Sequence, residues 1–172
     1  MVLTKSELIA SLQKEVQILL HLAGKVDRDK LDYRPTPKQR STLELLRYLS
    51  MMGPTIVRWS LDPKQDFAIW TQAAQEADAR GFDQTVAAIA HQRDEYATLL
   101  GNLSDADFRT EITSFDGSKT SRGSFLVNLV LSGCAAYRTQ LFLYLKACGR
   151  EELSTYNLWA GMDAPAPAPA SA

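Results

Sequence analysis

The sequence predicts an all-α protein: a four-helix bundle with long connections after helices two and three and a short C-terminal extension. Three observations predict this class. Apolar residues recur at three- and four-residue steps in four separate stretches, as they do along one face of a helix. Capping residues begin these stretches, and proline- or glycine-containing segments separate them. A chain of 172 residues is long enough for one hydrophobic core, so we expect one bundle domain over residues 1–163.

The first helix is predicted at residues 5–24, where apolar side chains from Leu8 to Ala23 follow helical spacing and charged residues occupy the other faces. The segment after it contains Pro35 and Pro37. Proline cannot occupy a helix interior, and it pushes the residue before it into an extended conformation. This segment is therefore predicted to be a connection.

The second helix is predicted to begin at Ser41. Ser41 and Glu44 form an S-x-x-E capping box, in which the two side chains satisfy backbone amides of the first turn. An apolar row follows, and it continues past Pro54 as far as Trp59. Because the row continues, we expect Pro54 to kink this helix, with a short break as the alternative.

The central part of the chain has a weaker pattern. Residues 61–70 are predicted to form a loop whose aromatic side chains pack on the bundle, and residues 71–79 a short polar helix. The third helix is predicted from Asp83, a good N-cap, to Gly101. After it we expect a helical turn at residues 104–105 and an extended segment at 110–114.

The fourth helix, from Ser121 to Gly149, is the most apolar. It contains fifteen consecutive uncharged residues between Arg122 and Arg138. One face repeats at helical spacing and is predicted to be buried. This face comprises Leu126, Leu129, Val130, Gly133, Tyr137, Gln140, Leu141 and Tyr144.

The C-terminal extension is predicted to have two parts. Residues 151–163 should form a short structured segment whose side chains cover an open apolar surface. These side chains are Leu153, Tyr156, Leu158 and Trp159. Residues 164–172 alternate alanine and proline and have no means of burying apolar surface, so we expect them to be disordered.

Composition and charge exclude several classes of partner. The net charge is −1 and the chain has no long basic block, so we expect neither nucleic acid nor an anionic membrane as a partner. The uncharged run is shorter than the roughly 20 apolar residues that a bilayer-spanning helix needs. The N-terminal segment lacks the apolar core of a signal peptide, so we expect a cytoplasmic location.

The residue types that carry most chemistry are few and scattered. Cys134 and Cys148 fall on one helix about 21 Å apart, so they cannot form a disulfide with each other and are interpreted as free thiols. Cys134 adjoins the candidate site and is interpreted as a small buried group, with a reactive thiol as the alternative.

His21 is interpreted as a helix-end residue. His91 and Glu95 stand four residues apart and are interpreted as a solvent-exposed pair, with a pair of metal ligands as the alternative. The sequence contains no P-loop, CxxC or HExxH motif.

Two segments resemble the DinB-like, or YfiT-like, superfamily of four-helix bundles. Residues 31–49, LDYRPTPKQRSTLELLRYL, are similar to the proline-rich segment of that family and the S-x-x-E-L-L-x-H sequence after it. Residues 133–149, GCAAYRTQLFLYLKACG, are similar to H-x-x-x-H-R-G-Q-L-x-x-Y-L and its helix-ending glycine. The resemblance extends along the whole chain in helix number and order. It implies a bundle of the kind that commonly pairs as a homodimer.

The resemblance also indicates where a functional site should lie. In that family three histidines hold a divalent metal, and their positions correspond here to Tyr48, Gly133 and Tyr137. Such a metal site needs neutral imidazole nitrogens, whereas a phenol must lose a proton to compete and glycine has no side chain. We therefore expect no metal at this position and no cofactor. The resemblance places Arg138 and Gln140 in a structural role across the bundle.

Two interpretations of this position remain open. In one, the tyrosines fill a closed site, and Tyr48 occupies the space beside Gly133. In the other, the pocket stays open and offers hydrogen-bond donors to a small anionic or carbonyl ligand. The candidate binding residues are Tyr48, Gly133, Tyr137, Arg138, Asn128 and Glu44.

The sequence thus favours a metal-free bundle of unknown specific activity, acting as a small-ligand binding or interaction module. One alternative is a metal- and thiol-dependent transferase, isomerase or hydrolase of the same superfamily. The other is a purely structural or regulatory helical protein.

Overall fold

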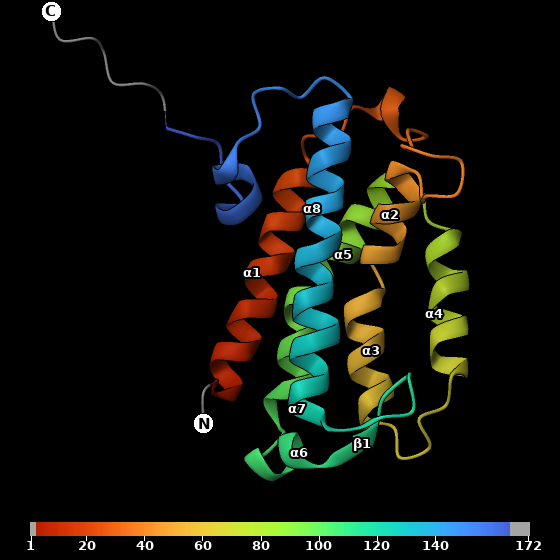
Figure 1. The fold of residues 1–172 in the computed structure, drawn as a ribbon, viewed down its shortest axis with the longest axis vertical. Coiled ribbons are helices and arrows are strands. Elements are labelled where there is room, and N and C mark those ends of the chain that lie inside the picture. The colour runs from red at the N-terminus through yellow and green to blue at the C-terminus, as the bar shows by residue number, and fades with distance from the viewer. Residues whose placement is uncertain (1–2, 166–172) are drawn as a thin grey trace, which may run out of the picture.

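The computed structural model describes residues 3–165 and confirms the all-α class (Figure 1). The bundle has four helical columns that pack on one another. They are α1 (Lys5–Ala23), α2 (Thr42–Leu49) with α3 (Met52–Leu61), α5 (Phe82–Gly101), and α7 (Arg122–Phe125) with η2 (Leu126–Leu131) and α8 (Ser132–Ala147). A further helix, α4 (Ala68–Asp78), lies outside the bundle against α2 and α3.

Short elements join the columns. A 3-10 turn, η1 (Arg28–Lys30), precedes α2, and α6 (Asp105–Arg109) follows α5. Strands β1 (Glu111–Thr113) and β2 (Lys119–Ser121) form an antiparallel hairpin in which Ile112 pairs with Thr120. The extended segment and helical turn predicted after the third helix are therefore present. The predicted polar helix is also present, and begins three residues earlier than expected.

Helix ends follow the capping signals of the sequence. The Ser41 backbone N–H donates to Glu44 Oε2 at 2.7 Å, and the Glu44 N–H donates to the Ser41 hydroxyl at 3.3 Å, which completes the predicted capping box. Ser121 caps α7 through its side chain alone, accepting from the Ser124 N–H. After α8, Gly149 adopts φ +97°, which a glycine tolerates without strain.

Pro54 has a larger effect than the predicted kink. Helix α2 ends at Leu49, and α3 begins at Met52, so Pro54 lies in the first turn of a new helix. The proline ring would clash with the carbonyl four residues earlier, that of Ser50, and proline has no N–H to donate to it. The chain leaves the helix at Ser50 and Met51, and the unfavourable contact is avoided. The column is thus broken, and not bent.

The fourth column also differs from the prediction. Residues 126–131 form a π-helical segment, after which the Ser132 backbone N–H donates to the Val127 carbonyl five residues earlier. The Ser132 hydroxyl donates to the same carbonyl at 3.1 Å. Of the face predicted to be buried, Leu126, Val130, Leu141 and Tyr144 are buried, and Phe125, Cys134, Arg138 and Leu145 are buried as well. The row Leu129, Gly133 and Tyr137, predicted to be buried, is only half-buried. Single π-turns often accompany functional sites, and this row faces the cavity described below.

The core lies between α1, α3, α5 and the fourth column. Its largest fully buried side chain is Tyr96 of α5. The Tyr96 ring reaches across to α3, where it fills the space beside Gly53. A Cβ on Gly53 would overlap the Tyr96 hydroxyl oxygen and would lie 3.3 Å from Val130 Cγ1. A glycine at position 53 therefore allows α3, α5 and η2 to approach closely.

The C-terminal segment covers the bundle only in part. Leu153 is buried, as predicted. Asn157 is also buried, and its side-chain Nδ2 lies 2.9 Å from both Asp163 Oδ1 and His21 Nε2. Trp159, in the short π-turn η3 (Tyr156–Ala160), is instead 67% exposed. Residues 166–172, which include most of the predicted Ala/Pro tail, lie outside the described residues.

Within residues 3–165, one helix is long and apolar enough to cross a membrane by length and composition, Arg122–Ala147. The whole helix is longer than its fifteen-residue uncharged run. It packs against α1, α2 and α3, as a core helix of a bundle does. The cytoplasmic location stays a prediction.

Candidate functional site

A cavity of about 660 Å³ opens between α2, α3, α4 and the fourth column. Two rows of side chains at four-residue steps form its facing walls. Tyr48, Met52 and Ile56 line it from α2 and α3. Leu129, Gly133 and Tyr137 line it from η2 and α8. The remaining lining residues are Phe67, Trp70, Phe115 and Asn128.

The two tyrosines of the candidate site meet at one end of this cavity. The rings of Tyr48 and Tyr137 lie edge to face, with centroids 4.9 Å apart and an interplanar angle of 66°. Trp70 packs on the other side of Tyr48 at 6.0 Å. This arrangement is favourable for aromatic rings, whose edges are positive and whose faces are negative. Helices two and four thus come together at the residues that the sequence singled out.

Arg40 covers the exposed side of Tyr48. The Arg40 guanidinium carbon lies 4.0 Å from the Tyr48 ring centroid, within the range of a cation–π contact. Burial raises the pKa of Tyr48 well above its usual value, and the neighbouring Tyr137 adds to this effect. The Tyr48 phenol is therefore neutral at physiological pH and serves as a hydrogen-bond donor and acceptor.

Gly133 faces Met52, and not Tyr48 as predicted. A Cβ at position 133 would lie 3.4 Å from Met52 Sδ and 3.5 Å from its Cε. These are ordinary contact distances, so the missing side chain of Gly133 leaves space in the cavity wall opposite the Met52 thioether. The prediction that Tyr48 fills this space is wrong because Tyr48 lies in α2, four residues before Met52, and its ring packs on Tyr137.

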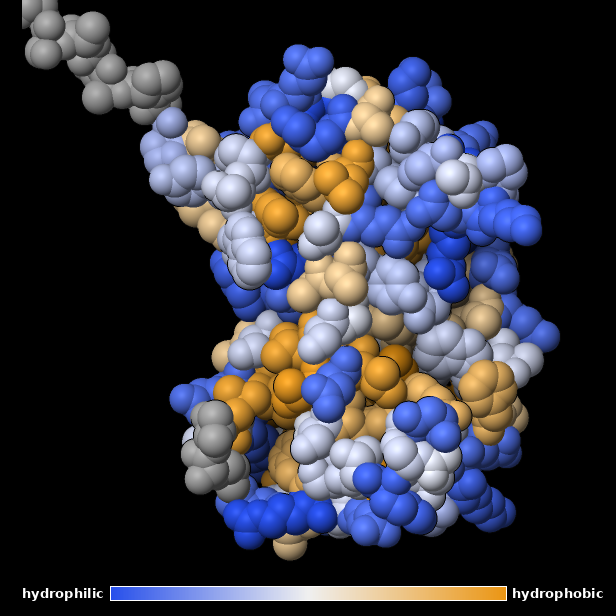
Figure 2. Space-filling view, viewed as in Figure 1, coloured by the Kyte–Doolittle hydropathy of each residue, from blue (hydrophilic) through white to orange (hydrophobic). Residues whose placement is uncertain are grey.

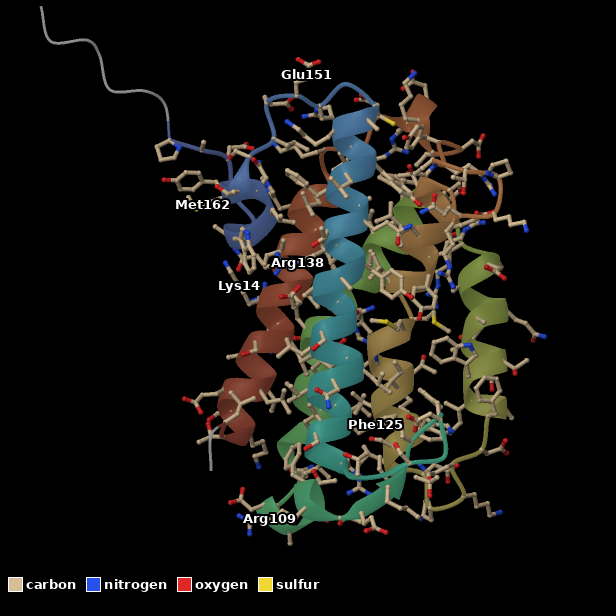
Figure 3. All side chains as sticks on the ribbon, in the orientation of Figure 1. Lys14, Arg109, Phe125, Arg138, Glu151 and Met162 are labelled. Atoms are coloured by element: carbon tan, nitrogen blue, oxygen red, sulfur yellow. The ribbon has the colours of Figure 1, made fainter. Side chains whose placement is uncertain are left out.

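The opposite rim of the cavity consists of aromatic side chains from loops. Phe67, just before α4, is 57% exposed, and Phe115, in the β1–β2 turn, is 47% exposed. Phe115 packs on Trp59 with ring centroids 4.4 Å apart and, at 5.5 Å, on Phe125, which is labelled in Figure 3. The rim therefore joins the hairpin to the core of the bundle.

The sequence analysis did not include Met52, Ile56, Phe67, Trp70, Phe115 or Leu129 among the candidate site residues. A signal for Met52 and Ile56 was present, because they follow Tyr48 at four-residue steps. The contribution of Phe115 depends on the path of a hairpin that follows α6. No spacing in the sequence brings it to α3.

Arg138 does not line this cavity. It is buried on the opposite side of α8, where its Nε lies 2.7 Å from Glu15 Oε2 on α1. The Arg138 guanidinium also donates to the Leu158 carbonyl and lies 5.1 Å from the centre of the Trp159 ring. Burial raises the pKa of Glu15, and the Arg138 charge opposes that rise. Arg138 thus joins α1, α8 and the C-terminal segment, which is the structural role that the resemblance implied.

Glu44 and Asn128 lie at the edges of the site. The Glu44 carboxylate caps α2 and is paired with Arg34 at 3.2 Å, and it lines a neighbouring hollow of about 340 Å³ that shares Tyr48 and Trp70. Asn128 is exposed and lines the cavity itself. The cavity therefore contains Tyr48, Gly133, Tyr137 and Asn128, whereas Glu44 is adjacent and Arg138 is elsewhere.

The other groups singled out by sequence make no site in the described residues. Cys134 is buried, and burial raises the pKa of its thiol to about 12, so almost no reactive thiolate is present at neutral pH. Cys148 is also a free thiol. Glu95 is paired with Arg58 of α3, and not with His91.

A divalent metal does not fit the cavity residues. The three positions that the family resemblance assigns to histidines carry two phenols and a glycine. Metal binding by Tyr48 would need a phenolate, and the raised pKa of this phenol opposes ionisation. Within residues 3–165, no three His, Cys, Asp or Glu side chains gather as a metal-binding group.

The fold is shared with a protein of known structure. The chain is similar to a DinB-like protein, YjoA, from Bacillus subtilis, with a TM-score of 0.68 and 17% sequence identity. The match covers 87% of this chain and 96% of the other. No protein-family profile and no curated protein sequence matches the chain.

Proposed function

We propose that this DinB-like bundle is a metal-free protein that binds a small, neutral, largely apolar molecule in the cavity beside Gly133. The observation that carries the proposal is the lining: a cavity of about 660 Å³ surrounded by aromatic, aliphatic and thioether side chains with no charged residue. Cavities of this size and composition are typical of small-molecule sites. The lining also contains few polar groups, which would fix the orientation of a ligand.

The chemistry of the lining defines the class of ligand. The phenol hydroxyls and the Asn128 amide can donate to a carbonyl oxygen or accept from a hydroxyl. A carboxylate would find no cation in the lining, since Arg138 is held by Glu15 on the far side of α8. Burial of an unpaired anion is strongly unfavourable. We therefore narrow the ligand class to aromatic or branched aliphatic aldehydes, ketones, alcohols and thiols.

Matched pairs of small molecules test the ligand class. We expect benzaldehyde and acetophenone to raise the melting temperature of the full chain, because a ligand that binds only the folded state stabilises it. Benzoate, which has the ring of benzaldehyde and a negative charge, should have no effect. Stabilisation by benzoate equal to that by benzaldehyde would contradict the neutral-ligand class.

Variants of the cavity wall test the location. Gly133→Leu should fill the space opposite Met52 and abolish binding of the aldehyde in calorimetry, whereas Tyr137→Phe should weaken it about 5- to 10-fold through loss of one hydrogen bond. Tyr156→Phe removes an exposed hydroxyl outside the cavity and serves as the matched control. Equal affinities in all three variants would place the binding site elsewhere.

The metal-free part of the proposal has its own test. Elemental analysis of protein purified without a histidine tag should find no stoichiometric zinc, nickel or manganese. The triple change of Tyr48, Gly133 and Tyr137 to histidine should create zinc affinity, because imidazoles would then face one another across the α2–α8 contact. Stoichiometric metal in the natural chain would contradict the proposal in favour of the metal- and thiol-dependent alternative.

A further inference from the structure

A second cavity lies at the end of the molecule where α1 and the fourth column begin. It has a volume of about 500 Å³ and lies between α1, α6 and the fourth column. Figure 2 shows hydrophobic residues gathered over this part of the fourth column, whose outer face is uncovered. The apolar side chains that line the cavity are Leu3, Leu8, Phe108 and Val127. It is distinct from the larger cavity beside Gly133, and Asn128 is the one residue that lines both.

Gly123 allows α6 to form one wall of this cavity. A Cβ at position 123 would lie 3.2 Å from the carbonyl oxygen of Phe108, which is a tight contact, so the glycine lets α6 approach α7 closely. The Arg122 guanidinium strengthens this contact by donating to the Asp107 carbonyl at 2.8 Å. The position of α6 is therefore fixed by contacts with α7, and α6 supplies Phe108 and Arg109 to the cavity.

The second cavity has an excess of positive charge, whereas the larger cavity has no charged lining residue. Its charged lining residues are Lys5, Asp105 and Arg109. Lys5 Nζ donates to the carbonyls of Gly101 at 2.6 Å and Leu103 at 2.9 Å, which orient the ammonium group without neutralising its charge. Arg109 lies 3.9 Å from Asp105 and its side chain is 73% exposed, so this ion pair is weak. The two cations thus outnumber the single carboxylate among the described lining residues.

The charged groups lie toward one end of this cavity. In Figure 1, α1 and the fourth column begin at the same end of the molecule and run in the same direction. Arg109, labelled in Figure 3, ends α6 at this same end. Lys5 begins α1, and Leu8 lies about one turn, roughly 5 Å, further along it. Val127 likewise lies more than one turn beyond the first residue of the fourth column. The cations are therefore at the outer end, and apolar side chains extend inward from them.

We propose that this second cavity binds a small amphiphile with one carboxylate head and an unbranched alkyl chain, such as a medium-chain fatty acid. The head would accept hydrogen bonds from Arg109 beside the charge of Lys5, and hydrogen bonds between charged groups are stronger than neutral ones. The chain would lie on Leu8, Phe108 and Val127, where each methylene group removed from water adds to the affinity. The inference is independent of the ligand proposed for the larger cavity.

Titration calorimetry of the full chain with a series of carboxylates tests the ligand class. We expect octanoate to bind with one-to-one stoichiometry, and each methylene group added from hexanoate to decanoate to strengthen binding up to about fourfold. Octylamine, which has the same chain and a positive head, should bind at least about tenfold more weakly. Benzoate has the head without the alkyl chain and should also bind much more weakly. Equal affinities for octanoate and octylamine, or no saturable binding of decanoate, would overturn the proposal.

Variants of the charged end test the location. Arg109→Gln should weaken octanoate binding about tenfold, and Asp105→Asn should strengthen it because a competing carboxylate is removed. Arg109→Glu should reverse the preference, so that octylamine binds more tightly than octanoate. Arg93→Gln makes the matched change on the exposed face of α5 and should leave the affinity unchanged. Because all three residues are exposed, these changes should not disturb the fold.

Three further results would overturn the proposal. Unchanged octanoate affinity in both Arg109→Gln and Arg109→Glu would show that this cation does not hold the head. Loss of octanoate binding in Gly133→Leu, with normal binding in Arg109→Gln, would place the carboxylate in the larger cavity. Co-sedimentation of the chain with phosphatidylglycerol vesicles, without binding of free octanoate, would assign the positive end to a membrane surface. Failure of benzaldehyde to bind, in contrast, concerns the larger cavity alone.

Discussion

Two helical glycines, Gly53 and Gly133, lie on facing walls of the same bundle and have opposite surroundings. At Gly53 a Cβ would overlap the hydroxyl of Tyr96 and lie 3.1 Å from its Cζ. At Gly133 a Cβ would meet only Met52, at an ordinary contact distance of 3.4 Å. Both glycines face a large side chain from another helix. Only the first is forced to be glycine by what already fills the space.

The difference shows that side chains fill the interior completely around Gly53 and only partly around Gly133. Around Gly53 the side chains are fully buried and fixed, as close-packed interiors are. Around Gly133 the wall is half-buried and adjoins the cavity. A glycine in an apolar helix therefore borders a cavity only when no side chain from another helix fills the space beside it. Here that condition selects Gly133, and the predictions below test the contrast.

The largest effect is expected for Gly53→Ala. The new methyl group must displace the buried Tyr96 ring, which is rigid and has no free space beside it. Overpacking of this kind typically costs about 1–3 kcal/mol, and complete overlap with a fixed ring places the change at the upper end. We expect a loss of about 3 kcal/mol in the free energy of unfolding, measured by urea denaturation.

The double variant Gly53→Ala with Tyr96→Phe provides the control. Removal of the Tyr96 hydroxyl removes the overlapping atom, and that hydroxyl has no hydrogen-bond partner among residues 3–165. The double variant should therefore recover at least half of the lost stability. No recovery would show that the cost of Gly53→Ala arises from the backbone or from Val130, and not from Tyr96.

An intermediate effect is expected at alkaline pH. Burial raises the pKa of Tyr96 in the core and of Tyr48 in the cavity wall. In the unfolded chain both phenols lose their protons near pH 10, whereas in the folded chain they keep them. Their contribution to stability is therefore complete below about pH 10 and declines as the pH rises above it. Urea midpoints measured on both sides of this pH should show the decline.

Single variants separate the two phenols. Tyr96→Phe and Tyr48→Phe should each flatten the alkaline decline, and the effect should be larger for Tyr96 because its phenol is fully buried. Parallel declines in the natural chain and both variants would mean that other groups cause the alkaline loss.

The smallest effect is expected for Gly133→Ala. The new methyl group makes an ordinary contact with Met52, and alanine favours a helix interior over glycine by about 1 kcal/mol. We expect the free energy of unfolding to rise by up to about 1 kcal/mol. Gly101→Ala, where a Cβ would meet nothing within 4 Å, shows the gain from helix propensity alone. Destabilisation at position 133 alone would mean that this wall is as tightly packed as that at Gly53.

Local signals were sufficient to predict most of the fold. Capping boxes, helical periodicity and the prolines after α1 predicted the helices and their order, because each depends on contacts within one or two turns. The failures had a common cause. The break at Ser50, the π-turn at 126–131 and the outward position of Leu129 depend on how the fourth column fits against α3, which spacing alone does not determine.

The candidate site was only partly predictable for the same reason. The sequence and its family resemblance indicated Tyr48, Gly133 and Tyr137; the two tyrosines are in contact, and Gly133 lines the same cavity opposite Met52. The side of α8 that Arg138 takes is decided by Glu15, more than one hundred positions earlier in the chain. Because the Arg138 charge is buried with that carboxylate, Arg138 does not line the cavity, and the ligand that we propose narrows from an anionic or carbonyl compound to a neutral one.

The sequence by itself thus determined the class of the fold and the helices that form it. It also placed two phenols and a glycine at the positions where the family that it resembles carries histidines. Only the tertiary structure decided which spaces are filled: Tyr96 closes the space at Gly53, Met52 leaves a cavity at Gly133, and one face of the fourth column stays uncovered. Helix formation depends on neighbours a few residues apart. The filling of space depends on side chains brought together from different helices, and no local pattern in the sequence records their fit.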